Sequence, residues 1–492
     1  MAIESPGCRA VAYCRRRPEQ TALYQVVQQH LETYLALAGE DDWDGQRVPA
    51  HVEREFRRYL ECGILAYGFA RARCPDCGHD FLVAFSCKGR GLCPSCNARR
   101  MAETAAHLVD HVFPPLPVRQ WVLSVPKRLR WYLEREPRAL SAVLQILLRV
   151  IQAHLCQASD AGAHARFGAV SFIHRFGSSL NCHVHYDENH PGFRASRALS
   201  GAQIRSRRIG HCCVIDGVFE PLEDASSLCE GVCFRPAAAL TPDTIAAITE
   251  QVRVRVLRWF ARRGLIEPDA VREMLAWENS GFSLDAAVCV AAHDRPGLER
   301  LLRYCARPPF ALARLELLDD ERVIYRLPAC SGIGQRDGTT ALTLTPLELI
   351  DHLAALIPPP RRHRHRYHGV LAPNSPLRAA AVALGRDLTD DPSALTEVAT
   401  PPTAPTRNGR SPARYLWVML LARLFESLPL VCPNRGADMR LIAFVVEAAS
   451  TSALPGNRHR PRAGGSRPCA PPVHCPTRSR PSPRQNRISA SP

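Results

Sequence analysis

Two histidines separated by one aliphatic residue lie soon after a short apolar segment of this 492-residue chain. The run is Leu180-Asn-Cys-His183-Val-His185-Tyr186, and the apolar segment is 169–173. Alternate side chains of a β-strand point to the same face, so His183 and His185 would face the same way. Two neighbouring imidazoles can chelate one divalent cation and leave coordination positions for a substrate oxygen. A bare His-x-His pair is also typical of ordinary surface or core histidines, so the context must decide.

A polar, turn-rich segment at 187–210 separates this pair from a second apolar run that begins at His211. Excision of 187–210 would leave His183-Val-His185-Tyr-His211-Cys-Cys-Val-Ile-Asp-Gly-Val-Phe, one continuous strand with three histidines on one face. We interpret 187–210 as an insertion, and His211 as a third candidate ligand of a catalytic divalent ion.

Two Cys-x-x-Cys motifs stand close together among the 20 cysteines, Cys74-Pro-Asp-Cys77 and Cys93-Pro-Ser-Cys96. In a long chain without a secretory signal, clustered cysteines bind metal more often than they form disulfides. Four thiolates at this spacing predict one closed, tetrahedral zinc site. Cys87, between the motifs, is a possible substitute ligand or a structural bystander.

The chain is strongly basic, with 63 Lys and Arg against 47 Asp and Glu and a net charge of +16. Such a balance favours a polyanionic partner, nucleic acid before an anionic membrane. Some of these cations adjoin aromatic side chains such as Trp131 and Tyr132, a combination that suits single-stranded nucleic acid. For the strip at 361–368, a solvated linker is the alternative to nucleic-acid contact. The candidate DNA-binding residues are Lys88, Arg90, Arg99, Arg100, Lys127, Arg128, Arg303, Arg307, Arg361, Arg362, Arg364 and Arg366.

Tyr304 lies in a basic segment, Leu301-Leu-Arg-Tyr304-Cys-Ala-Arg307, whose helix must end at Pro308-Pro309. A helical tyrosine usually belongs to a core or an interface. A basic neighbourhood and a metal elsewhere in the chain are nevertheless what a phosphate-attacking tyrosine needs, so Tyr304 is the candidate nucleophile. Tyr367, in the strip at 361–368, is the reserve candidate.

Apolar periodicity predicts helices over 20–70, 138–156, 241–278 and 413–430, and short strands between them. The N-terminus lacks the basic and apolar regions of a signal peptide, so we expect a cytoplasmic, nucleoid-associated protein. No membrane and no small-molecule substrate is expected. The predicted regions are an N-terminal helical region (1–65), a zinc-binding domain (66–112), a larger domain with the candidate histidines and tyrosines (113–384), a linker (385–412), a C-terminal helix and strand (413–449) and a disordered basic tail (450–492).

With these motifs in place, the chain resembles the rolling-circle insertion-sequence transposases of the IS91-like type over about residues 20–449. The resemblance implies an α+β fold with an N-terminal zinc ribbon and an HUH nuclease domain, in which an antiparallel sheet is flanked by helices. It rests on the two cysteine motifs with Phe85-Ser-Cys87-Lys-Gly-Arg-Gly between them, Arg119-Gln-Trp-Val-Leu-Ser-Val-Pro126, Ser179-Leu-Asn-Cys-His183-Val-His185, Asp216-Gly-Val-Phe219, Arg303-Tyr-Cys-Ala-Arg-Pro-Pro309 and Arg361-Arg-His-Arg-His-Arg-Tyr-His-Gly369.

The resemblance also implies a mechanism for DNA transposition. His183 and His185 would hold Mg or Mn, which polarises a scissile phosphate in single-stranded DNA at the element ends. Tyr304 would attack that phosphate, which gives a 5′-phosphotyrosine and a free 3′-hydroxyl. Members with two nucleophiles carry them four residues apart, and here Arg300 stands four residues before Tyr304, so the chain resembles a one-tyrosine type.

The chain departs from the family pattern in three places. The segment 187–210 separates His211 from the other histidines, and the C-terminal knuckle Cys432-Pro-Asn-Arg435-Gly has lost one thiolate. The arginine-rich tail is the third departure, and a frameshifted reading of the gene would produce it. Two rival hypotheses follow: a catalytically dead, zinc-containing DNA-binding protein from a decayed transposase gene, and a zinc-dependent regulator that binds RNA.

Overall fold

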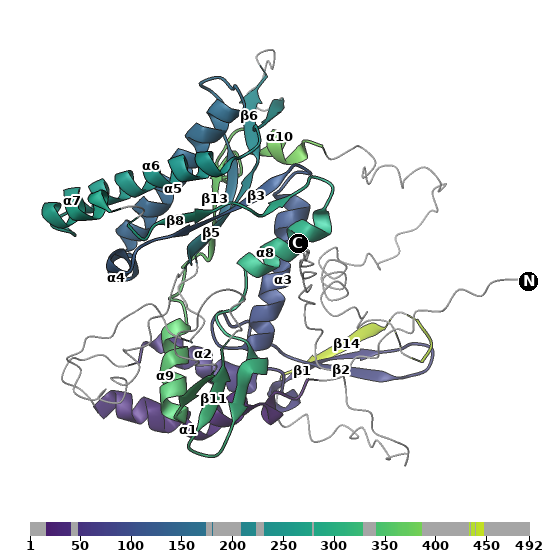
Figure 1. Cartoon of the computed structure of the whole chain (residues 1–492). Coiled ribbons are helices and arrows are strands. Elements are labelled where there is room, and N and C mark those ends of the chain that lie inside the picture. The colour runs from purple at the N-terminus through teal and green to yellow at the C-terminus, as the bar shows by residue number, and fades with distance from the viewer. Residues whose placement is uncertain are drawn as a thin grey trace, which may run out of the picture.

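A computed structural model describes residues 16–40, 48–173, 180, 208–222, 231–277, 280–327, 341–385, 432, 434–437 and 439–446. Its elements make a mixed α+β fold whose sheets are antiparallel, which confirms the predicted fold class at that level (Figure 1). His183 and His185, the predicted linker beyond Gly385, the predicted helix at 413–430 and the tail from 450 lie outside the described residues.

The central sheet has the strand order β13-β4-β5-β3-β8, and β9 pairs with β3 as well. Every pairing in it is antiparallel. The inner strands are buried along nearly their whole described length, which is why their sequences are continuous apolar runs instead of alternating ones. The strands are β3 (Val118–Ser124), β4 (Gly168–Ile173), β5 (Arg208–Ile215), β8 (Ser283–Asp285), β9 (Cys289–Val290) and β13 (His365–Gly369).

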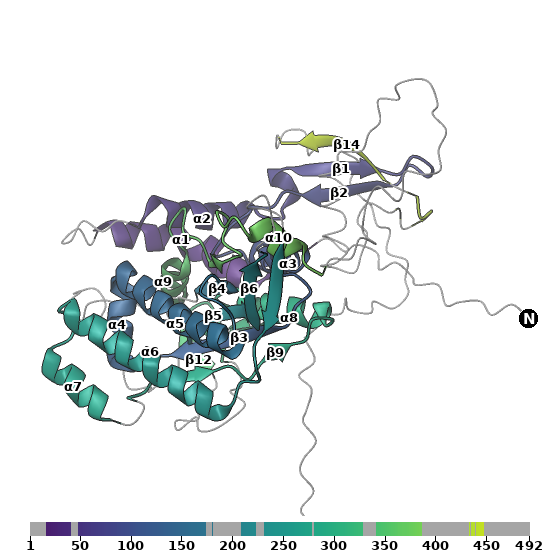
Figure 2. The ribbon, with the colours of Figure 1, turned by 90° about the horizontal axis from the view of Figure 1, so that it is seen from above.

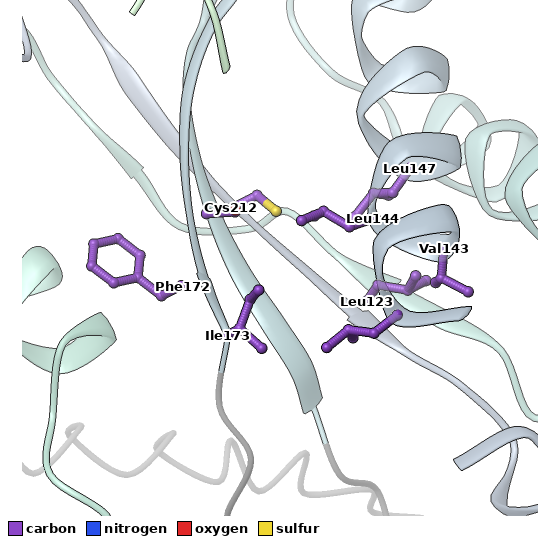
Figure 3. A pocket seen from close by; sticks show the side chains of 9 residues that line it. Leu123, Val143, Leu144, Leu147, Phe172, Ile173 and Cys212 are labelled. Atoms are coloured by element: carbon purple, nitrogen blue, oxygen red, sulfur yellow. The ribbon is translucent and has the colours of Figure 1, made fainter. Parts of the chain in front are cut away.

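One face of this sheet is covered by α5 (Pro137–Ala158) and α6 (Pro242–Arg262), as Figure 2 shows. The layer is extended by α4 (Lys127–Arg135) and α7 (Pro268–Ala276). α5 is long and apolar enough to cross a membrane by composition, yet its buried residues form the core against the sheet. Figure 3 shows the small apolar hollow there, where Leu144 and Leu147 of α5 face Cys212.

The opposite face is covered by α3 (Pro94–His111), α8 (Arg295–Cys305) and α10 (Arg378–Ala383). Arg295, at the start of α8, donates to the carbonyl oxygen of Phe113 at 2.8 Å and of Pro114 at 3.0 Å. These bonds satisfy carbonyl groups just beyond the end of α3 and fix the two helices to each other. A β-ribbon, β6 (Gly217–Pro221) and β7 (Val232–Pro236), continues from β5.

A second core lies at the other end of α3, at the bottom of Figure 1. Its helices are α1 (Ala22–Glu40), α2 (Ala50–Glu61) and α9 (Pro346–Leu356), and its strands are β10 (Leu315–Leu317), β11 (Val323–Arg326) and β12 (Ala341–Leu344). Thr345 caps α9 in a capping box with Glu348, a local signal that the sequence carries in full.

A third sheet joins distant parts of the chain, in the order β14-β1-β2. β1 (Phe69–Arg73) pairs with β2 (Asp80–Ala84) on one edge and with β14 (Arg440–Val445) on the other. Figure 2 shows this sheet projecting from the rest of the molecule.

Replacement of Gly369 by alanine should destabilise the central sheet. Gly369 ends β13 at φ +61°, and a Cβ there would overlap the carbonyl oxygen of Phe167. Gly264 is the matched control, because it has φ +64° and no atom lies within 4 Å of the position that its Cβ would take. We expect Gly264→Ala to cost about 1–2 kcal/mol for the left-handed backbone, and Gly369→Ala to cost about 1–3 kcal/mol more for the overlap. Urea unfolding of both variants measures the difference, and equal midpoints would contradict it.

Candidate functional site

Four cysteines lie together where the end of α2, the loop before α3 and the start of α3 meet. Their sulfur atoms all lie within 4.8 Å of one another, and they are Cys62, Cys87, Cys93 and Cys96. Cys62 Sγ lies 3.6 Å from that of Cys93 and 3.8 Å from that of Cys96, and Cys87 Sγ lies 3.5 Å from that of Cys96. Cys93 is the residue before the first turn of α3, and Cys62 is the residue after the last turn of α2. Two helix ends and one loop therefore set the four thiols.

The surroundings of these thiols suit a tetrahedral zinc ion. The backbone N–H groups of Cys87 and Gly89 donate to the sulfurs of Cys62 and Cys87, each at 3.3 Å, which favours the thiolate form. The Cys62 thiol raises the pKa of both Cys87 and Cys93, so the four groups cannot all ionise without a nearby cation. Zinc supplies two positive charges, and Arg16, 3.5 Å from the Cys62 sulfur, offsets part of the remaining negative charge.

Three further cysteines form a second cluster, which corrects the predicted zinc site. Cys74 and Cys77 lie with Cys432, and their sulfur atoms are also within 4.8 Å of one another. The two Cys-x-x-Cys motifs thus contribute to different clusters and do not complete one site together. Each motif finds its partners elsewhere because β1 and β2 carry Cys74 and Cys77 away from the start of α3.

The sequence analysis did not identify Cys62 as a zinc ligand. For Cys87 it gave two alternatives, a substitute zinc ligand or a structural bystander. Cys62 has no motif around it, so no local signal could have identified it. Cys87 had a signal, its place in a Gly-rich loop between the two motifs, and Cys432 stood in the recognisable remnant Cys432-Pro-Asn.

The structure brings His211 and Tyr304 together beside the central sheet. His211 is fully buried on β5, and Tyr304, 40% exposed, lies on the last turn of α8. The two rings meet edge to face, with 5.4 Å between their centroids and 82° between their planes. The guanidinium of Arg307 lies 4.8 Å from the Tyr304 ring centroid. A buried imidazole, an accessible phenol and a guanidinium cation therefore lie close together at this point of the sheet.

The side chain of Gln120, on β3, contacts the ring nitrogen Nδ1 of the buried His211. Its side-chain amide lies 2.8 Å from Nδ1 of His211, and β3 pairs with β5 at this level. An amide can present oxygen or nitrogen to the ring. In the structure the amide nitrogen of Gln120 faces Nδ1, which then accepts the hydrogen bond. With the amide reversed and its oxygen presented, Nδ1 donates and His211 Nε2 carries the lone pair that a metal ligand needs.

The register of β5 changes the C-terminal bound of the predicted insertion. Residues 208–210, which the sequence placed inside the segment 187–210, already belong to β5, with Gly210 opposite both Ile173 and Leu123. The residues that lead directly into His211 along β5 are therefore Arg208, Ile209 and Gly210, with a register shift against β3 between Gly210 and Arg208.

Two of the predicted basic segments converge between the cysteine cluster and β13. Arg90 donates to the backbone oxygen of Arg362 at 2.6 Å, and Arg100 donates to that of Lys88 at 3.1 Å. Burial, together with the positive charges of Arg90 and Arg100, lowers the pKa of Arg364 to about 10. The Nε atoms of Arg90 and Arg100 are buried without a hydrogen-bond partner among the described residues. Buried cationic donors of this kind suit the oxygens of a phosphate.

The remaining predicted DNA-binding residues are more scattered. Arg99 pairs with Glu103 and Arg303 with Glu299, so both have a carboxylate partner. Arg366 lies 3.3 Å from the hydroxyl of Ser141 on the other face of the sheet. The other members of the set are Lys127 and Arg128 at the start of α4 and Arg361, which has φ +61°.

Tyr367, the reserve nucleophile, is part of the sheet. It is half-buried on β13, burial raises its pKa, and the guanidinium of Arg378 lies 5.2 Å from its ring centroid.

Comparison with known families agrees with this arrangement. Residues 26–125 match the family described as "Transposase zinc-binding domain", and this segment contains the whole four-cysteine cluster. Residues 209–378 match the family described as "Putative transposase", and this segment contains His211, Tyr304 and β13. The chain matches no curated protein sequence and no solved structure.

A zinc-binding module followed by a domain of this kind defines a transposase, a DNA-processing enzyme. The chain belongs to the IS91-type transposases, as its sequence predicted. DNA is therefore its partner, and the four-cysteine cluster within the zinc-binding domain supports a structural zinc ion.

Replacement of Cys62 by serine should remove one zinc ion per chain and destabilise the N-terminal module, because a four-thiolate site would lose one ligand. Zinc content by mass spectrometry and a thermal melt provide the measurement. Cys233→Ser is the control, since Cys233 is exposed on β7 and outside both clusters. Loss of the same zinc ion from a Cys74→Ser variant would instead support one site made by both motifs.

Replacement of Arg100 by alanine should weaken binding of single-stranded DNA. Removal of one phosphate contact should reduce the slope of log affinity against log salt by about 0.7. Fluorescence anisotropy between low and moderate salt measures both quantities. Arg272→Ala is the matched control, because Arg272 is exposed on α7 and paired with Asp269. An equal change in the two variants would exclude a local role for the basic cluster.

Proposed function

We propose that this transposase nicks and rejoins single-stranded DNA through a covalent link to Tyr304. The observation that carries the proposal is the edge-to-face contact between accessible Tyr304 and buried His211 on the central strand. A nucleophile needs access to its substrate, and Tyr304 is the partner of this pair that reaches the surface.

In the proposed step, the Tyr304 oxygen attacks a backbone phosphorus. The bond from phosphorus to the 3′-oxygen breaks, the phenol proton passes to solvent or to a base, and the leaving 3′-oxygen takes up a proton. The products are a 5′-phosphotyrosine and a free 3′-hydroxyl. The covalent link conserves the energy of the phosphodiester, so attack by a 3′-hydroxyl can reverse the step and rejoin DNA. Arg307, over the Tyr304 ring, would stabilise the phenolate and the phosphate.

The buried His211 fits a divalent-ion site when the Gln120 amide presents its oxygen to Nδ1. Together with His183 and His185 it would hold Mg or Mn, which when bound polarises the scissile phosphate. The roles of His183 and His185 remain predictions, because both lie outside the described residues. The chain's own contribution is to hold the His211 ring edge-on to Tyr304 and to fix its tautomer through Gln120.

We further propose that the basic cluster of Arg90, Arg100 and Arg364 binds the backbone of DNA that leads to Tyr304. Ile173, the last residue of β4, donates to the backbone oxygen of Arg364, and β4 pairs directly with β5. Neighbouring strands are about 4.8 Å apart, so this arginine backbone lies about 10 Å from β5 across the sheet. The DNA would be the single-stranded ends of the mobile element, in the bacterial cytoplasm.

One observation favours a second function, a zinc-containing DNA-binding protein that no longer cleaves. The three residues of β5 that precede His211 are Arg208, Ile209 and Gly210, none of which is a histidine. β5 itself therefore offers a divalent ion no imidazole besides that of His211. In this alternative the zinc module and the basic cluster bind DNA, and the chemistry is lost.

Cleavage of end-labelled single-stranded DNA from the sequences that flank the gene tests the proposal, with Mn or Mg present. A covalent adduct should carry the 3′ label, because the protein is joined to the downstream 5′ end, and the 5′ label should appear in a shorter strand that a polymerase extends. Tyr304→Phe should abolish the adduct by at least about a thousandfold and keep DNA affinity. Tyr367→Phe is the matched control, because it makes the same change at the other candidate tyrosine.

A version without residues 187–210 separates the two functions. In that version His185 would stand two residues before His211 and His183 four residues before it. An adduct from this version alone, lost again when Tyr304→Phe is added, would assign the natural chain to the DNA-binding function. DNA binding without an adduct from either version would exclude the tyrosine mechanism.

A further inference from the structure

We propose that Cys74, Cys77 and Cys432 form a second zinc site, with three protein thiolates and an exchangeable fourth ligand, that fastens the C-terminal strand to the N-terminal sheet. The site joins Cys432 to cysteines of the zinc-binding domain match, which ends at residue 125. It is independent of the DNA cleavage proposed above.

The two parts of this site have the same backbone design. The N-terminal knuckle reads Cys74-Pro-Asp-Cys77-Gly-His, and the C-terminal knuckle reads Cys432-Pro-Asn-Arg435-Gly-Ala. In each, the first cysteine donates its N–H to the carbonyl five residues later, to His79 at 2.9 Å and to Ala437 at 2.8 Å. In each, the glycine four residues later donates back to the cysteine carbonyl, at 3.0 Å and 2.8 Å.

The glycines agree as well, with φ +69° at Gly78 and φ +68° at Gly436. The two knuckles thus share one turn geometry, and they differ at the fourth position, where Cys77 corresponds to Arg435.

Backbone donors point at the sulfur of the first cysteine in both knuckles. The backbone N–H groups of Cys77 and Asp76 act to lower the pKa of the Cys74 thiol, and those of Asn434 and Arg435 act in the same way on Cys432, although burial and the neighbouring sulfurs leave the pKa of Cys74 raised overall. Such donors stabilise a thiolate over a thiol. Cys77 Sγ lies 3.5 Å from Cys432 Sγ, so sulfur atoms from both ends of the chain face one point. Two knuckles that each prepare thiolates for a shared point make a zinc site.

Three thiolates leave one corner of a tetrahedron for a ligand from solution. When zinc binds, each thiol gives its proton to solvent, and the ion with three thiolates carries one net negative charge. Water or an external thiolate can complete the site. Zinc prefers four ligands, so this site should release its ion before the four-cysteine cluster does.

The packing of β14 explains why a metal would matter there. Ile442, Phe444 and Val446 are 55%, 66% and 72% exposed, so the strand buries little apolar surface. Its pairing with β1 is interrupted by a register shift between Arg71 and Ala72. Besides the ladder, Cys432 and Met439 attach this segment through a small buried cluster with Cys74, and the Phe444 ring lies 6.4 Å from that of Phe85. A zinc–sulfur bond at Cys432 would therefore supply much of the attachment.

Zinc counting on the purified full chain, without DNA, tests the proposal. We expect two zinc ions per chain in the natural protein, one in Cys432→Ser, and two in the Cys233→Ser control. A stepwise titration with a chelator should remove one ion well before the other. Hydrogen exchange should show that the amides of 440–445 lose protection in that first step, while those of α3 keep it.

Arg435→Cys is the decisive variant, because it should gain affinity and so cannot be explained by misfolding. A fourth thiolate at the Cys77-equivalent position should tighten the weaker site by about tenfold or more. One zinc ion per natural chain, two in Cys432→Ser, or an unchanged weaker site in Arg435→Cys would each overturn the proposal. The result is separate from cleavage, since a chain that never cleaves DNA can still hold two zinc ions.

Discussion

The register of β5 between β4 and β3 is the constraint on which the arrangement of this transposase depends. Along β5, His211 and Cys213 face α3 and α8, whereas Cys212 and Val214 face α5. A slip of one residue would put the imidazole into the apolar layer under α5 and remove it from Tyr304. Both neighbouring strands oppose this slip, because Phe172 and Val122 lie directly opposite His211 in an antiparallel ladder. The site is therefore held by backbone pairing and by two cores of different shape, more than by any contact of its own.

The helix α3 connects the four-cysteine cluster to the central sheet. Cys93 caps its start, its first turn carries Cys96, its next turn carries Arg99 and Arg100, and its second half packs against α8. A zinc ion at the start of the helix would therefore fix the direction in which Arg100 projects. It would also fix the position along α3 at which α8 packs, and with it the position of Tyr304. The zinc module and the transposase domain are joined in this way by one rigid helix, with the basic cluster beside the junction.

Local sequence patterns predicted much of the fold and fewer of the residues of the site. The apolar periods at 138–156 and 241–278 predicted α5, α6 and α7, and in the structure Thr241 is the N-cap of α6. These features are local, since a helix stripe or a cap involves residues a few positions apart. Tyr304 was a candidate because its own segment is basic. His211 was a candidate because its strand continues the histidine pattern.

The pairing of the cysteines could not be predicted, because it is a property of the whole chain. Two Cys-x-x-Cys motifs are compatible with one shared site, and the sequence between them is short enough to allow it. The strands β1 and β2 exclude that solution, and their partner β14 comes from the other end of the chain. Likewise, nothing near Arg364 indicates that Arg90 and Arg100 will lie beside it. Convergence of this kind depends on long-range packing, which a reading of neighbouring residues does not contain.

Backbone geometry and metal-binding chemistry depend on different residues, and two places in this chain illustrate the difference. Arg208, Ile209 and Gly210 belong to β5 because a strand requires backbone hydrogen bonds, whichever residues precede His211. The knuckle at Cys432 keeps its turn with arginine at the fourth position, because Gly436 and two backbone hydrogen bonds determine that turn. A ligand side chain contributes little to such backbone geometry, so its loss leaves the fold intact. The same loss removes a metal ligand outright, and a transposase gene under relaxed selection would therefore lose its chemistry well before it loses its structure.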